Sequence, residues 1–134
     1  MIGDTNMKKR LFALLGVLLV LTVALTGCTV FSGSAAGRLS ITKAASWTIT
    51  ASSVNGHESR KVNMSADNLA ALKVVSTNNE GTVSLVITEG DNTRTVDISG
   101  QYSGNIDTSG FTAGKINLRL NYEKVKDANI IITW

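Results

Sequence analysis

The clearest chemical group in the sequence is the thiol of Cys28, the only cysteine among the 134 residues. A thiolate is the strongest nucleophile that this segment offers for alkylation. The preceding residues, Thr26 and Gly27, are small, and small residues let an extended backbone enter a protease cleft. These features single out Thr26-Gly27-Cys28 as a candidate site of covalent processing.

The other candidate catalytic and metal-binding groups form no such motif. His57 is the only histidine and follows Asn55-Gly56, so we expect a solvated turn residue without an acid partner. Ser, His and Asp all occur, but no Gly-x-Ser-x-Gly sequence does. Oxygen ligands for Ca²⁺ could come from Glu89, Asp91, Asp97, Asp107, Glu123 and Asp127. Their spacing is not that of a calcium loop, which favours turn and surface charges, so we predict no catalytic residue and no bound metal.

An apolar block precedes Cys28 and sets where the rest of the chain is expected to go. Lys8-Lys9-Arg10 is followed by 15 uncharged residues, Leu11 to Leu25. A membrane-spanning helix needs about 20 apolar residues, whereas this length and basic start are typical of a signal peptide. Because basic residues resist translocation, the chain after Cys28 is predicted to be exported.

The run Leu25-Thr26-Gly27-Cys28 resembles the lipobox of bacterial lipoproteins. The resemblance implies that Cys28 receives a diacylglyceryl group, that residues 1–27 are removed, and that Cys28 becomes an acylated N-terminus. Two acyl chains give firm membrane attachment, at about 0.8 kcal/mol per buried methylene. We therefore expect a protein held on the extracytoplasmic face of a bacterial cell membrane. The alternative is an uncleaved signal anchor with an incidental cysteine.

The composition after residue 27 narrows the possible partners and cofactors. These 107 residues contain ten Lys or Arg and nine Asp or Glu, so the overall charge of +3 comes mostly from the signal segment. A nearly neutral domain is not expected to bind nucleic acid. Because lipidation would consume the only cysteine, we predict no disulfide, no cysteine-based zinc site and no cofactor beyond the covalent lipid.

The hydrophobic pattern divides the chain into three parts. Residues 1–27 form the signal peptide, residues 28–45 are small and polar and predict a flexible tether, and residues 46–134 show alternation with period two. The alternation is cleanest from Lys115 to Glu123. Roughly seven or eight short antiparallel strands are best buried as two packed sheets. We predict an all-β, jelly-roll-like sandwich.

Turn residues separate the expected strands. Asn55-Gly56 is the strongest hairpin signal, and Asn78–Gly81, Glu89–Asn92 and Lys124–Asp127 predict further reversals. A single helical turn is possible near Ala66, and the chain is expected to loosen after Gly100.

Two longer segments resemble small bacterial lipoproteins with a jelly-roll-like sandwich. They are Asn55–Met64 with its following strands, and Ile106–Leu120, which is similar to the closing strands of galactose-binding-like domains. The resemblance implies a scaffold for binding and no catalytic residue set.

The aromatic residues suggest where binding could occur. Trp47, Tyr122 and Trp134 lie at inward positions, whereas Tyr102 and Phe111 occur in a glycine-rich region and are the candidate ligand contacts. Three hypotheses follow: binding of an envelope protein or glycan through these loops, an accessory role on a membrane complex, or a hydrolase without a visible site. An exposed aromatic pair favours the first hypothesis and an apolar outer sheet face the second, whereas a deep pocket holding His57 and a carboxylate favours the third.

Overall fold

The computed structural model describes residues 29–134, so the signal segment and Cys28 lie outside the described residues. No helix within this range is long and apolar enough to cross a membrane. The elements follow in the order β1 (Val30–Ala36), β2 (Leu39–Lys43), β3 (Ser46–Met64), α2 (Ala66–Ala71), β4 (Lys73–Thr77), β5 (Glu80–Glu89), β6 (Asn92–Asp97), β7 (Gln101–Asn105) and β8 (Gly114–Thr133).

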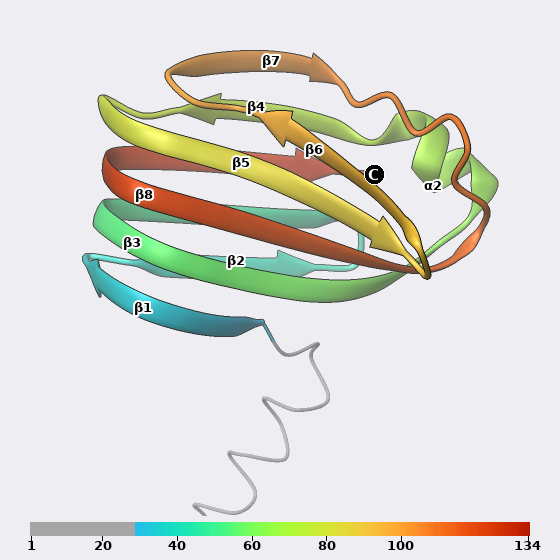
Figure 1. The fold of residues 1–134 in the computed structure, drawn as a ribbon, viewed down its shortest axis with the longest axis horizontal. Helices are drawn as coiled ribbons and strands as arrows, with labels where there is room; N and C mark the ends of the chain where they lie inside the picture. The colour runs from blue at the N-terminus through green and yellow to red at the C-terminus, as the bar shows by residue number, and fades with distance from the viewer. Residues whose placement is uncertain (1–28) are drawn as a thin grey trace, which may run out of the picture.

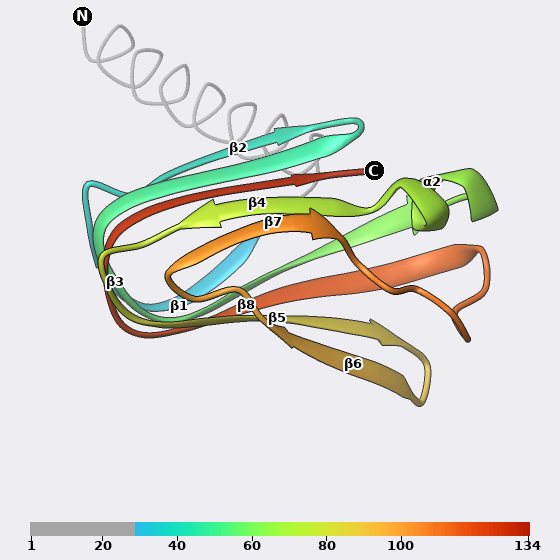
Figure 2. The same cartoon turned by 90° about the horizontal axis from the view of Figure 1, so that it is seen from above.

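The strands form an antiparallel sandwich, as the alternation predicts (Figures 1 and 2). Two long strands, β3 and β8, pair along nearly their whole length and bend, so each runs through both layers. The β1 layer has the order β1, β3, β8, β5, β6, and the β2 layer has the order β2, β3, β8, β4, β7. The apolar side chains between the layers form one core.

The bend in β3 lies at Asn55-Gly56, where the hairpin prediction is wrong. The strand continues from Ser46 to Met64, and its register against β8 shifts between Val54 and Gly56. Gly56 has φ of +124°, faces Gly33 of β1, and has no room for a Cβ beside the Ser32 carbonyl. The glycine serves a close approach between strands and a bulge, two roles that a local hairpin signal does not distinguish.

The bend in β8 replaces the reversal predicted at Lys124–Asp127. Lys124 and Asp127 have positive φ angles of 50° and 52°, a left-handed conformation that non-glycine residues adopt mainly at bulges and turns. The Lys124 N–H donates to Oδ1 of Asn55 at 3.1 Å, which ties the two bends together. Asn55 therefore fixes where the sandwich folds over.

The predicted tether is also wrong, because most of residues 29–45 belong to the sandwich. β1 pairs with residues 53–59 of β3, and β2 pairs with residues 46–50. The alternation of Leu39 and Ile41 indicates a possible edge strand, which corresponds to β2. No pattern indicates β1, because it is an exposed edge strand whose small residues show no alternation. The first strand of the described residues begins at Val30.

Several local predictions are confirmed. Gly90-Asp91 closes the hairpin of β5 and β6. The helical turn is α2, with Ser65 and Asn68 forming a reciprocal capping box. Trp47, Tyr122 and Trp134 are buried in the core.

The reversal predicted at Asn78–Gly81 is instead a bend, because β4 and β5 run in the same direction along β8, opposite residues 129–133 and 117–126, and the chain passes from one layer to the other.

Candidate binding surfaces

The predicted ligand contacts Tyr102 and Phe111 are both half-buried and pack against the core. Tyr102 lies on edge strand β7, opposite Ser76 of β4, so the region predicted to be loose contains a strand. Phe111 lies in the connection between β7 and β8. Each hollow described below that includes Phe111 lacks Tyr102 in its lining. The two aromatic side chains therefore do not share one of these hollows.

Phe111 lines two shallow hollows in the connection before β8. The larger one, about 350 Å³, lies beside α2 and includes the hydroxyl-bearing residues Thr108, Ser109 and Thr112. The smaller one, about 130 Å³, lies beside the start of β6. An aromatic ring among hydroxyl groups is an arrangement that could contact a sugar.

Polar contacts hold this connection against β6 and the end of β5. Arg94 lies over the Phe111 ring at 5.5 Å and donates to the carbonyl oxygens of Asp107 and Ser109. The Ser109 N–H donates to the Asp107 carboxylate at 3.0 Å and lowers its pKa. Glu89 accepts hydrogen bonds from the N–H and hydroxyl of Thr112. These contacts tie the connection that carries Phe111 to β5 and β6.

The outer face of the β2 layer carries an exposed apolar row. Ile41, Val75 and Ile131 are between 37% and 43% exposed, and the strand register aligns them across the layer. The row runs through Ile41, Thr48, Ile131, Val75 and Ser103. The rows on either side are mostly polar, with Lys43 and Lys73 in one and Asn129 and Gln101 in the other. An uncharged centre with a polar rim is the common composition of a protein-binding surface.

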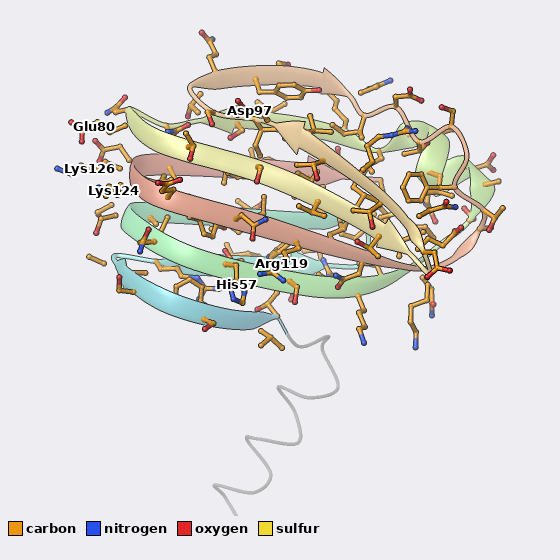
Figure 3. The ribbon with its side chains drawn as sticks, viewed as in Figure 1. His57, Glu80, Asp97, Arg119, Lys124 and Lys126 are labelled. Carbon is orange, nitrogen blue, oxygen red and sulfur yellow. The ribbon has the colours of Figure 1, made fainter. Side chains whose placement is uncertain are left out.

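The outer face of the β1 layer is mostly polar, with Val30 at its edge and Val86 on β5 as apolar members, and it contains His57. One row across this layer runs through Ser32, His57, Asn121, Ser84 and Asp97. His57 and Asp97 are three strands apart, about 14 Å at the usual strand spacing, and Figure 3 shows them well separated. The carboxylate of Asp97 instead accepts from Ser99, whose hydroxyl and N–H lower its pKa. His57 therefore has no carboxylate partner in this row.

A buried charge cluster joins β1 and β2 to the two long strands. Glu58 of β3 is fully buried. One of its carboxylate oxygens accepts from the Tyr122 hydroxyl, and the other pairs with the guanidinium of Arg38. The Arg38 guanidinium also lies 4.4 Å from the centre of the Phe31 ring. Burial and the Glu58 charge raise the pKa of the Tyr122 hydroxyl, which keeps it protonated as a donor.

A second buried cation secures the end of the chain. Arg60 donates to the carbonyl oxygens of Ser46 and Lys43, at 2.9 and 2.8 Å, and lies 5.1 Å from the Trp134 ring. Burial lowers the pKa of this guanidinium. Sequence reasoning missed Glu58 and Arg60, although the alternation of Val62 and Met64 places both on the inward side.

A further groove of about 610 Å³ lies at the bent end of the sandwich. Its lining combines small residues such as Ser34 and Ala35 with Lys124 and Lys126. Glu80 and Lys126 form an exposed ion pair at 3.6 Å on its rim (Figure 3). The groove is open to solvent and holds no buried polar pair that would fix a ligand.

The described part of the chain contains no group of three His, Cys, Asp or Glu residues that could hold a metal ion. No protein-family model matches the sequence, and no curated protein matches it either. The surfaces described above therefore carry the functional argument.

Proposed function

We propose that this protein is a lipid-anchored cell-envelope protein whose sandwich binds a partner protein in the envelope. The anchor is Cys28, with residues 1–27 removed on export. The supporting observation is the contrast between the two outer faces, because one is mostly polar and the other carries the apolar row of Ile41, Ile131 and Val75 across its centre. Apolar side chains gathered in one row of an outer sheet face mark binding surfaces more often than scattered single ones do.

The binding surface is the outer face of the β2 layer, and the partner is an envelope protein with an apolar patch. No catalytic role is expected, since the residues on either side of His57 in its row, Ser32 and Asn121, carry a hydroxyl and an amide, and the carboxylate of Asp97 is three strands away. This assigns the protein an accessory role on an envelope assembly.

Photocrosslinking along β8 tests this proposal with a matched control. Ile131 points outward from the β2 layer, and Arg119 on the same strand points outward from the β1 layer. A photoreactive residue replacing Ile131 should give an adduct of one discrete mass in intact cells, whereas one replacing Arg119 should not. An Ile131→Asp change should abolish co-purification of that crosslinked protein. Equal adducts at both positions, or none at either, would contradict the proposal.

A second candidate function is glycan binding at Phe111, which the hydroxyl-lined hollow of about 350 Å³ favours. Titration of envelope glycan fragments into the acylated protein should then shift the NMR signals of the Thr108 and Thr112 backbone amides. Phe111→Ala should remove that response while Tyr102→Ala leaves it intact, because Tyr102 does not line the hollow. A response that survives Phe111→Ala would eliminate this site.

A further inference from the structure

We propose that the edge formed by β1 and β2 lies directly on the lipid surface that holds the anchor. This inference rests on the proposed lipidation of Cys28. The occupant is an anionic bilayer surface, as indicated by the short chain between Cys28 and β1, the apolar residues on the edge, and the charge of the edge.

The distance along the chain leaves no room for a spacer. Only Thr29 separates Cys28 from Val30, the first residue of β1. Two residues of extended chain span about 7 Å at most. A lipid on Cys28 therefore lies next to the first strand, which holds that side of the domain at the headgroups.

The same side of the sandwich is an edge in both layers. β8 occupies one side of β3 throughout, while β1 and β2 occupy its other side, each in its own layer. Figure 1 shows β1 and β2 as the outermost strands along one side of the sandwich. We call this the β1–β2 edge.

The β1–β2 edge carries exposed apolar side chains. Val30 on β1 is 63% exposed and Leu39 on β2 is 55% exposed, the highest values among the exposed large hydrophobic residues of the described chain. Side chains of this kind at a membrane-proximal edge can enter the boundary between headgroups and acyl chains.

Charge is distributed unevenly between this edge and the opposite one. No acidic residue occurs from Thr29 to His57, and the first one, Glu58, is buried and paired. Residues 29–64 contain four Lys or Arg residues and one acidic residue, whereas residues 65–134 contain six Lys or Arg residues and eight acidic residues. Lys43 and Lys61 are the exposed cations of the first group.

The opposite edge, formed by β6 and β7, would be repelled by an anionic surface. Four acidic residues lie on or beside these strands, against two cations, Arg94 on β6 and Lys73, which lies opposite Asn105 of β7. The acids are Glu89, Asp91, Asp97 and Asp107. Both the attachment point and the electrostatics therefore place the β1–β2 edge toward the membrane.

Probes at the two ends of one cross-strand row test this orientation. The row runs through Leu39, Thr50, Asn129, Thr77 and Gln101. Leu39 and Gln101 are exposed at opposite edges of the same face, about 19 Å apart at the usual strand spacing. Once Cys28 is a thioether, a new cysteine is the only free thiol, so Leu39→Cys and Gln101→Cys can each be labelled with one fluorophore.

The full-length acylated variants are placed in vesicles of phosphatidylcholine and phosphatidylglycerol that contain a headgroup-linked spin-label quencher. We expect the Leu39 probe to be quenched at least threefold more strongly than the Gln101 probe. Replacing Lys43 and Lys61 with Glu should lower the Leu39 quenching in these vesicles, and it should do so less in vesicles of phosphatidylcholine alone.

The intact mass of each sample separates the possible failures. A mass without acyl groups on Cys28 would overturn the proposed function and this inference together. An acylated protein with equal quenching at the two probes, or stronger quenching at Gln101, would overturn only the orientation. Self-quenching of the Leu39 probe that rises with protein density and is absent at Gln101 would assign the edge to a second copy of the chain, which also overturns the inference.

Discussion

Removing Arg38 should strongly destabilise the domain, because Glu58 would remain buried without its cation. Glu58 is fully buried, and the Arg38 side chain is 22% exposed. Deleting one partner of a buried ion pair costs about 3–5 kcal/mol. Since Arg38 is partly solvated, we expect Arg38→Ala to lower the free energy of unfolding by about 3 kcal/mol, which corresponds to a fall in Tm of roughly 12 °C for a domain of this size.

The measurement is urea unfolding of the full chain in mild detergent, followed by the fluorescence of the buried Trp47 and Trp134. A double-mutant cycle isolates the interaction, with Arg38→Ala and Glu58→Gln made singly and together. We expect the two changes to be coupled by about 2 kcal/mol, within the usual range for residues in contact.

The exposed ion pair of Lys126 and Glu80 supplies the matched control. Its side chains are more than half exposed and 3.6 Å apart, so Lys126→Ala should change the free energy of unfolding by less than about 1 kcal/mol. If Arg38→Ala costs no more than this control, or if the cycle gives a coupling below about 0.5 kcal/mol, the claim that Glu58 holds the β1–β2 connection is refuted.

Two further perturbations test the fold. Gly56→Ala should lower the free energy of unfolding in urea by about 2 kcal/mol or more, because a Cβ collides with the Ser32 carbonyl at a positive φ. Gly100→Ala, at a positive φ with open space around it, should lower it by only about 1 kcal/mol. Equal losses in the two variants would argue against the close approach of β1 and β3. Raising the pH above 10 should lower the free energy of unfolding. The unfolded chain then loses the Tyr122 proton near its ordinary pKa of 10.0 while the folded chain, with its raised pKa, retains it. The slope from this residue is up to about 1.4 kcal/mol per pH unit, and Tyr122→Phe should remove that contribution; an unchanged slope in this variant would contradict the assignment.

The parts of the fold that depend on local pattern were predictable from the sequence. The alternation from Lys115 to Glu123 gives the faces of β8 correctly, and the glycine and asparagine residues at Glu89–Asn92 mark a real hairpin. These features depend on neighbours within a few residues. They establish the all-β class without any knowledge of which strands pair.

The sequence-based predictions are wrong where the conformation of a residue depends on a partner that is distant in the sequence. Gly56 looks like a hairpin glycine, but its conformation serves Gly33 on another strand. Residues 29–36 look like a tether because an exposed edge strand needs no alternation, and pairing with β3 orders it. The inward position of Glu58 follows from parity, yet its cation is Arg38, 20 residues earlier in the chain, and no local pattern indicates that pair.

One of the candidate binding surfaces could be predicted from the sequence and the other could not. Phe111 could be singled out because it lies among glycine and hydroxyl-bearing residues, and it does line a hollow. The apolar row could not, because Ile41, Ile131 and Val75 come from three separate strands and align only through the register. A sequence pattern shows which residues alternate, but the sheet topology decides which of them become neighbours.

The most direct test of the account is the intact mass of the protein extracted from the membranes of cells that produce it. We predict a chain that begins at Cys28, lacks residues 1–27, and carries a diacylglyceryl group on its sulfur and an acyl group on its amino terminus. A chain that retains residues 1–27, or one in which the sulfur of Cys28 is unmodified, would contradict the anchor and with it the proposed place and partners of the sandwich.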